Sequence, residues 1–289
     1  MSHRSLLAHL ATAVVFFLAA APALGAPVAP TGPNWGWLFD DAAGPTAAAS
    51  WGGEDGSLAG DATFDTDTPF TYAGNGSLLL DGAGDWAEVA TLNGALNGET
   101  ALTMAFWVRS SATSQNRAFF GGANPDNADR FGGRYDSHGW LNGNGGTTEL
   151  IKFGLHINGS NYQYESAGGY QTTSWQHVVF TWQSGVGASL YVNGVLDTAS
   201  EVSPGIDRTG SPIAGSLSNQ TRFLIGNGAK NEWRGRIDEA LFWTSALSAD
   251  EAAWLASHSA SSLVPEPGLA LLLPVGLLGL VCVERRTRR

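Results

Sequence analysis

Aromatic side chains are the residues of this sequence whose type and spacing first suggest chemistry. They lie in and beside a Gly/Asn-rich connection over residues 121–148. A flat ring with a polar edge can pack against the apolar face of a pyranose and still hydrogen-bond. We therefore expect a carbohydrate site formed by Tyr135, Trp140, Tyr162 and Tyr164. The alternative is that these rings belong to the core, as most aromatics do in a tryptophan-rich sandwich.

Carboxylate pairs are the second group with chemical potential. Glycosidases need two carboxyl groups on the same side of the substrate. Glu54-Asp55 and Asp238-Glu239 are adjacent pairs, and neighbours along a strand point to opposite faces. The sequence also has no Gly-x-Ser-x-Gly or His-Glu-x-x-His motif and no phosphate loop. We therefore expect no enzyme; a divergent polysaccharide hydrolase or lyase is the weaker alternative.

Charge and cysteine content limit the partners. The formal net charge of −11 excludes nucleic acid, which requires a basic surface. The single cysteine, Cys282, excludes an internal disulfide framework.

Short strands must position these residues, because the chain is rich in glycines and aromatics, with 38 Gly, 13 Phe and 11 Trp in 289 residues. Trp175–Ala199 predicts three strands, the last two joined by an Asn193-Gly194 turn. The apolar run Leu102–Val108 indicates a strand covered on both faces. Ser248 and Glu251 form a capping-box pattern, which predicts one short helix over residues 249–257.

Both ends of the chain carry targeting patterns. Met1–Gly25 has a basic start, an apolar stretch and small residues before Gly25, as in a cleaved signal peptide. Residues 26–33 form a proline-rich linker. The apolar run Gly268–Val283 precedes four arginines, which favour a cytoplasmic end. As a helix it spans ~24 Å of a ~30 Å hydrocarbon core, so we expect a short membrane helix.

Residues Trp35–Ala256 resemble laminin G-like (concanavalin A-like) domains. The resemblance rests on SLLLDGAGDW at 77–86, LTMAFWV at 102–108, WQHVVFTW and LYVNGVL within 175–196, and the closing segment 223–251. It implies an all-β jelly-roll sandwich of two antiparallel sheets. It also implies a structural Ca²⁺, for which Asp238 and Asp40 are the candidate ligands. The alternative is that Asp238 caps the backbone or pairs with Arg234 or Arg236.

Residues 263–289 resemble a PEP-CTERM sorting segment. The resemblance rests on Val264, Pro265, Glu266 and Pro267, followed by the apolar run and the arginine cluster. It implies recognition by an exosortase-type membrane protease in a Gram-negative cell envelope.

Together these patterns predict four segments: a signal peptide (1–25), a linker (26–33), a sandwich domain (34–262) and a sorting and anchor segment (263–289). We expect an exported, non-catalytic envelope or matrix protein that binds extracellular polysaccharide and is at least transiently anchored in the inner membrane. A structural or adhesive module that recognises protein partners is the alternative.

Overall fold

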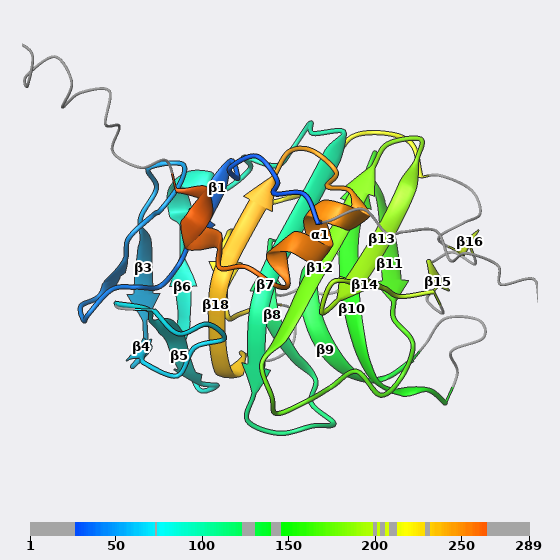
Figure 1. Ribbon diagram of the computed structural model, residues 1–289. Helices are drawn as coiled ribbons and strands as arrows, with labels where there is room; N and C mark the ends of the chain where they lie inside the picture. Colours follow the sequence, from blue (N-terminus) through cyan, green and yellow to red (C-terminus); the bar gives the residue numbers. More distant parts are fainter. Residues whose placement is uncertain are drawn as a thin grey trace, which may run out of the picture.

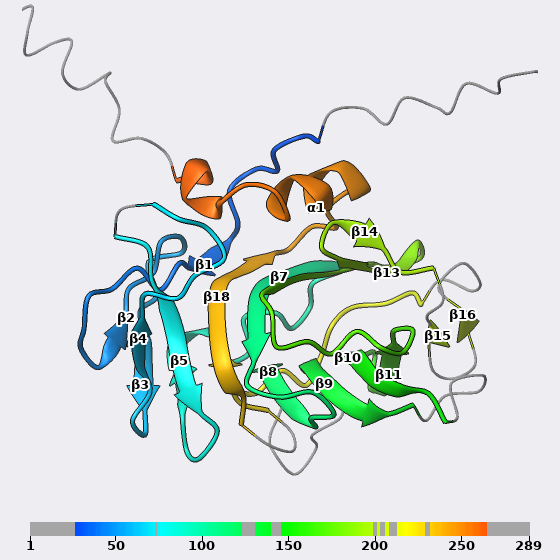
Figure 2. The same ribbon diagram turned by 60° about the horizontal axis from the view of Figure 1, so that its bottom comes forward.

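The computed structural model describes residues 27–264, apart from residues 73, 123–130, 140–145, 199–200, 203–205, 208–212 and 229–231. Two antiparallel sheets pack face to face within this part of the chain (Figures 1 and 2). The predicted all-β sandwich is therefore confirmed. The predicted signal peptide, and all of the sorting and anchor segment beyond Val264, lie outside the described residues. No helix within the described ranges is long and apolar enough to cross a membrane.

The first sheet has eight strands in the order β14-β13-β12-β7-β18-β5-β4, with β1 also paired to β18. Their bounds are β1 Trp35–Trp37, β4 Thr63–Asp65, β5 Ser77–Asp81, β7 Ala101–Ser110, β12 Gln176–Gln183, β13 Gly187–Val192, β14 Val195–Leu196 and β18 Arg234–Trp243.

The second sheet has ten strands in the order β16-β15-β11-β10-β9-β8-β17-β6-β3-β2. Their bounds are β2 Thr46–Ala47, β3 Gly56–Ala59, β6 Trp86–Glu88, β8 Arg117–Gly121, β9 Gly132–His138, β10 Thr148–Ile157, β11 Ser160–Glu165, β15 Glu201–Val202, β16 Ile206–Asp207 and β17 Leu224–Ile225. Strand β9 lies in the segment that the sequence indicated as a long connection.

The main core lies between the sheets. Leu102, Met104 and Phe106 of β7 point into it, because alternate residues of a strand share a face. Phe153 of β10 and Phe180 of β12 stack across the gap, with ring centroids 4.5 Å apart. These contacts fix the second sheet against the first.

A smaller core covers the outer face of the first sheet. Ala105 of β7 and Val179 of β12 pack there against Leu255 of helix α1 (Ala249–Leu255) and Ala260 of the 3₁₀ helix η3 (Ala260–Leu263). Figure 2 shows α1 and η3 lying across this sheet. Strand Leu102–Val108 is therefore buried on both faces, as its continuous apolar run predicts.

Two local predictions are confirmed in detail. Asn193 and Gly194 both have positive φ, 50° and 77°, which is what a type I′ hairpin turn requires. The Ser248 side chain accepts a hydrogen bond from the Glu251 N–H, and the Glu251 carboxylate accepts one from the Ser248 N–H. Helix α1 ends at Leu255, two residues before the predicted end.

Candidate functional site

An acidic pair lies at an irregularity of the central strand β18. The register between β18 and β7 shifts between Asp238 and Leu241, and Glu239 has a positive φ of 46°. This bulge interrupts the regular alternation of side chains along the strand. Asp238 and Glu239 are both buried, with exposed fractions of 1% and 2%.

Only half of the acceptor oxygens in this pair have donors. Asp238 Oδ1 accepts the Glu239 N–H at 2.7 Å. Glu239 Oε1 accepts the Ser259 hydroxyl at 2.7 Å and the Ala260 N–H at 2.9 Å. Asp238 Oδ2 and Glu239 Oε2 are buried and accept no hydrogen bond within the described part of the chain. A buried carboxylate oxygen without a donor or a cation is costly.

Asp40 adds a third carboxylate from the segment that follows β1. It comes directly after Phe39, whose φ of 56° turns the chain. Its Oδ1 accepts the Gly76 N–H at 2.9 Å, and its Oδ2 accepts the Tyr72 hydroxyl at 3.1 Å. The negative charge of Asp40 also acts on the carboxyl groups of Asp238 and Glu239.

Negative charge within this acidic site adds to the effect of burial on the pKa values of Asp238 and Glu239. Burial raises the pKa of Asp238 well above its usual range, and the negative charges of Glu239 and Asp40 raise it further. Burial likewise raises the pKa of Glu239 to about 7, with Asp40 adding to the effect. Burial also raises the pKa of Asp40. A hard cation with several oxygen ligands, such as Ca²⁺, would relieve this accumulation of negative charge.

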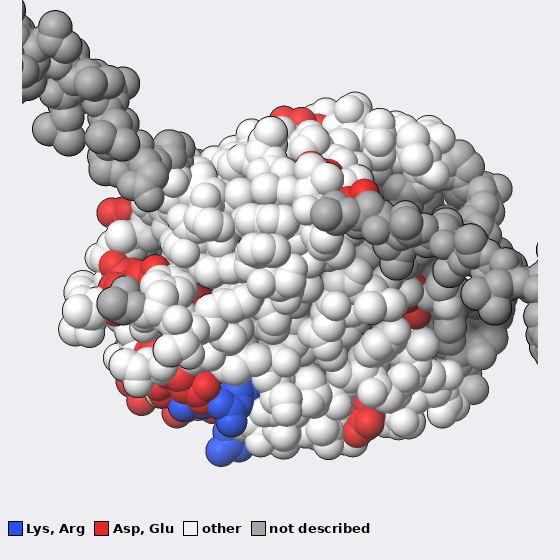
Figure 3. Space-filling model, in the orientation of Figure 1, with Lys and Arg blue, Asp and Glu red and all other residues white. Residues whose placement is uncertain are grey.

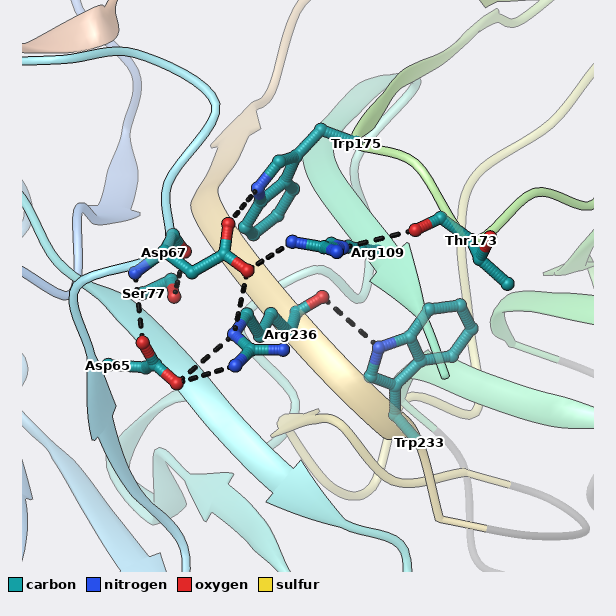
Figure 4. A network of polar contacts seen from close by, with 8 residues as sticks. All are labelled: Asp65, Asp67, Ser77, Arg109, Thr173, Trp175, Trp233 and Arg236. Atoms are coloured by element: carbon teal, nitrogen blue, oxygen red, sulfur yellow. Dashed lines mark hydrogen bonds and ion pairs between the residues drawn. The ribbon is translucent and has the colours of Figure 1, made fainter. Parts of the chain in front are cut away.

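The alternative ion pair of Asp238 with arginine is not found. Arg236 Nη2 lies 2.6 Å from Asp65 Oδ2, and its Nε lies 3.5 Å from Asp67 Oδ2 (Figure 4). Among the described residues, no ion pair joins Asp238 to Arg234 or Arg236. The arginines of β18 therefore leave the acidic site uncompensated, whereas backbone capping by Asp238 accounts for only one of its oxygens.

A second acidic group lies in two turns at the edge of the sandwich. Oxygen atoms of Asp61, Asp81 and Asp85 lie within 4.8 Å of one another. Asp85 is buried, and its two oxygens accept the N–H groups of Asp61 at 3.0 Å and Asp81 at 2.7 Å. These bonds hold the two turns together, which gives the group a structural explanation.

The aromatic side chains predicted to bind carbohydrate are mostly in the core. Tyr135 is fully buried and its hydroxyl donates to Gln176 Oε1 at 2.8 Å. Tyr162 and Tyr164 do share a strand face, but this face is the inner one, and Tyr164 is buried. Tyr135 and Tyr164 therefore offer no ring to a sugar, and the expectation for them was wrong. Tyr162 is half-buried, and Trp140 lies outside the described residues.

Few charges mark the face shown in Figure 3. Acidic side chains gather at its lower left, near β4 and β5, beside the few arginines in view. Asp65 of β4 and the nearby Asp67 form ion pairs with Arg109 and Arg236. The rest of this face is largely uncharged, which suits neutral more than ionic ligands.

A buried charged cluster lies on the second sheet and was missed by sequence reasoning. Arg134 and Asp136 of β9, Lys152 of β10 and Glu165 of β11 are all buried. Lys152 Nζ lies 3.1 Å from Asp136 Oδ2 and 2.9 Å from Glu165 Oε1. The strand alternation places these residues opposite the inward Phe153 and Tyr164. A lysine flanked by apolar residues was the only available signal.

The family of the chain follows from its sequence as well as its fold. A laminin G family model, described as the concanavalin A-like lectin/glucanases superfamily, matches residues 81–253, more than half of the chain. The chain belongs to this superfamily. The matched range includes Asp238 and Glu239 of the acidic site, while Asp40 precedes it.

Solved structures share the fold at low sequence identity. Domain 4 of AbnA, an extracellular arabinanase from Geobacillus stearothermophilus solved with arabinotriose, superposes with a TM-score of 0.53 at 17% identity, covering 78% of this chain and 98% of that domain. Trypanosoma rangeli sialidase in complex with the inhibitor DANA gives a TM-score of 0.53 at 17% identity, covering 82% of this chain and 34% of the sialidase.

A curated relative matches over a shorter stretch. The human adhesion G-protein coupled receptor D1 is 35% identical over 82 residues, which is 27% of this chain and 9% of the receptor. The chain thus spans only a small part of that receptor and about a third of the sialidase.

Proposed function

We propose that the sandwich is a non-catalytic carbohydrate-binding module stabilised by calcium. The observation that carries the proposal is the acidic site, in which Asp238 and Glu239 each keep one buried oxygen without a donor, and the negative charge of Asp40 raises the pKa of both. Three carboxylates that have no basic side chain as a partner among the described residues match the oxygen-rich coordination of Ca²⁺. Asp238 and Asp40 would be ligands, and Glu239 would join them.

Membership in a lectin and glucanase superfamily supports carbohydrate as the ligand class. An arabinanase domain of the same fold was solved with arabinotriose. Trp140 is the remaining aromatic candidate for a sugar contact, because the half-buried Tyr162 packs against the core. The mostly uncharged face of Figure 3 favours neutral polysaccharide, and an acidic polymer would need calcium to bridge it to this acidic protein.

The burial of two carboxylate pairs supports binding without catalysis. A glycosidase pair must be reached by its substrate with the two carboxyl groups on either side of the bond. The Asp238–Glu239 pair is buried, and the Asp136–Glu165 pair is buried and bonded to Lys152. Neither pair is placed to act on a polysaccharide.

We further propose that the protein is exported and sorted to the cell envelope or matrix of a Gram-negative bacterium. The apolar start of the chain and the Val264–Pro267 motif with its following apolar run and arginines support this. An exosortase-type protease would be the partner of the tail. Pulse labelling of the full chain, with and without Glu266→Ala, would test processing, because sorting predicts a shortened mature product only with Glu266.

An adhesive module that binds a protein partner is the second candidate. The side chains of Val195 and Leu196 in edge strand β14 are 69% and 41% exposed, and Val186 in the β12–β13 turn is 69% exposed. Exposed apolar residues beside an open sheet edge are a common feature of protein contacts. Val195→Lys would abolish binding to such a partner and leave sugar binding unchanged.

The proposal is tested by isothermal titration of the purified protein with neutral and acidic polysaccharides. We expect millimolar or tighter binding in calcium, its loss in Trp140→Ala, and no change in the control Trp254→Ala, a residue of α1 whose ring stacks on that of His258. Binding that survives Trp140→Ala would remove this residue from the site. Absence of binding to every polysaccharide would overturn the carbohydrate function.

A further inference from the structure

Lys152 is an unusual residue in an unusual place. Its side chain has no exposed surface, and lysine is seldom fully buried unless it is paired. The chain has 15 basic residues, of which only Lys152 and Lys230 are lysines. Arginine is the ordinary choice for a buried ion pair, because its planar guanidinium binds carboxylates with two hydrogen bonds. A lysine at this position supplies instead a compact amine, which is a nucleophile when it is neutral.

Two buried carboxylates flank this amine. Lys152 Nζ lies 3.1 Å from Asp136 Oδ2 and 2.9 Å from Glu165 Oε1, and these side chains are 4% and 0% exposed. In the strand register, Lys152 of β10 faces Glu165 of β11 on one side and Arg134 of β9 on the other. The sheet therefore holds an amine between two acids at close range with little access for water, which favours a reaction between them.

We propose that Lys152 and Asp136 join in an intramolecular isopeptide bond, with Glu165 as the proton carrier. Glu165 takes one proton from the Lys152 ammonium. The neutral Nζ then attacks Asp136 Cγ, the bond from Cγ to Oδ2 breaks, and Oδ2 leaves with one proton from Nζ and the one returned by Glu165. The products are an amide and one water, so ammonium and carboxylate are consumed in equal number with no oxidant or other reactant.

The donors around Asp136 are placed to assist this step. Arg134 Nε lies 3.1 Å from Oδ2, the oxygen that leaves. The His138 N–H donates to Oδ1 at 3.1 Å, where negative charge develops when the amine adds to the carbon. Fixed donors at oxygens that gain charge are a main source of rate enhancement in acyl chemistry.

The electrostatics of the cluster also favour the amide. The cluster holds two buried cations, Arg134 and Lys152, and two buried anions, Asp136 and Glu165. The reaction removes one of each and leaves Arg134 and Glu165, so net charge is unchanged while two desolvated charges disappear. The described sandwich contains no cysteine, since Cys282 lies in the tail. The amide would supply the covalent closure that disulfides give to other exported domains.

A tryptic peptide map of the full-length folded protein decides the matter. Trypsin cuts after Arg134, Lys152 and Arg208, so an unlinked chain yields peptides 135–152 and 153–208. A linked Lys152 resists cleavage, so we expect one peptide, 135–208, lighter by one water than the same uncut sequence. Peptide 135–152 at its full mass, or an uncut peptide with no loss of water, would overturn the proposal.

Three variants identify the roles of the residues. Lys152→Arg keeps a cation in the cluster but cannot react, and it should show no mass loss and a lower melting temperature. Asp136→Asn should lose ammonia in place of water if it reacts. Glu165→Gln should retain the full mass, and a complete water loss in this variant would contradict its part in proton transfer. If a variant fails to fold, the map of the unaltered chain still decides.

Discussion

Tyr72 donates a hydrogen bond to Asp40 Oδ2 at 3.1 Å, and this contact ties the segment after β4 to the acidic site. Burial raises the pKa of the Tyr72 hydroxyl, and the negative charges of Asp40, Asp238 and Glu239 raise it further. A tyrosine, a turn after β1 and a bulge of β18 thus meet at one acidic site. Negative charge accumulates at this site, and no arginine or lysine among the described residues pairs with it. This is the basis of the calcium prediction.

Calcium removal should lower the melting temperature of the protein. A ligand at 100 times its Kd stabilises the folded state by about 2.7 kcal/mol, so a chelator should remove about that amount from a saturated site. Differential scanning calorimetry in calcium and in chelator measures this directly. A melting temperature that does not respond to the chelator would rule out the calcium site.

Asp238→Asn should reverse its effect on stability between these two conditions. In calcium the variant loses a ligand and becomes less stable than the unaltered protein. In chelator it loses a buried negative charge that repels Glu239 and Asp40, so it becomes more stable. Asp61→Asn, in the other acidic group, is the matched control and should leave the calcium response intact. A variant that is less stable in both conditions would indicate a structural role without calcium.

His177 should make the fold sensitive to acid. It is buried beside Trp107, and burial lowers its pKa to about 3 from 6.5. Because the folded-state pKa is depressed, its contribution to stability is full above pH 6.5 and is lost as the pH falls from 6.5 toward 3.

Replacement of His177 isolates this contribution. Urea denaturation between pH 7 and pH 4 measures the free energy of unfolding. As the pH falls below 6.5, the unaltered protein should lose about 1.4 kcal/mol more of this free energy per pH unit than His177→Gln does, which is the value for one proton. His258→Gln, at an exposed position after α1, is the control. Equal pH slopes in His177→Gln and the unaltered protein would show that His177 does not remain neutral in the fold.

Asp67 is the centre of the ion-pair network drawn in Figure 4. It pairs with Arg109 and Arg236, and its Oδ1 accepts the Trp175 N–H at 3.0 Å. Asp67→Asn should cost about 1 kcal/mol of unfolding free energy, because three partners lose a charged acceptor that is partly screened by solvent. Glu88→Gln, which breaks the isolated pair with Arg222, should cost less than half of that. A smaller effect at Asp67 than at Glu88 would contradict the network.

Phe180 joins the two sheets through its stack on Phe153. Phe180→Ala should cost about 4 kcal/mol of unfolding free energy, since the neighbouring strands cannot collapse into the space left. Val186→Ala, at an exposed position, should change stability by less than about 0.5 kcal/mol. Guanidinium denaturation measures both, and a loss of under about 1 kcal/mol at Phe180 would contradict the core contact.

Much of the fold could be predicted from local patterns. The Asn193-Gly194 turn, the Ser248 capping box and the buried strand at Leu102–Val108 depend on backbone conformation and on alternation, which neighbouring residues determine. Asp238, and more weakly Asp40, were candidate calcium ligands from the family resemblance, and the charge of Asp40 acts on Asp238 in the structure.

The features that could not be predicted from the sequence depend on long-range pairing of strands and on which face of each strand is buried. Alternation placed Tyr162 and Tyr164 on one side, but it cannot say that this side is the core. The bulge at Glu239 is set by pairing with a strand far along the chain, so the burial of both acids was missed. Lys152 meets Asp136 and Glu165 only across three strands, and no local pattern marks that contact.

The central claim is that calcium at Asp238 and Asp40 maintains a sandwich that binds carbohydrate. A glycan array probed with the intact protein, once in calcium and once after chelation, tests it most directly. The account predicts binding to a defined set of glycans in calcium, and the loss of this binding after chelation and in Asp238→Asn. Equal binding in both conditions, or no binding to any glycan, would contradict it.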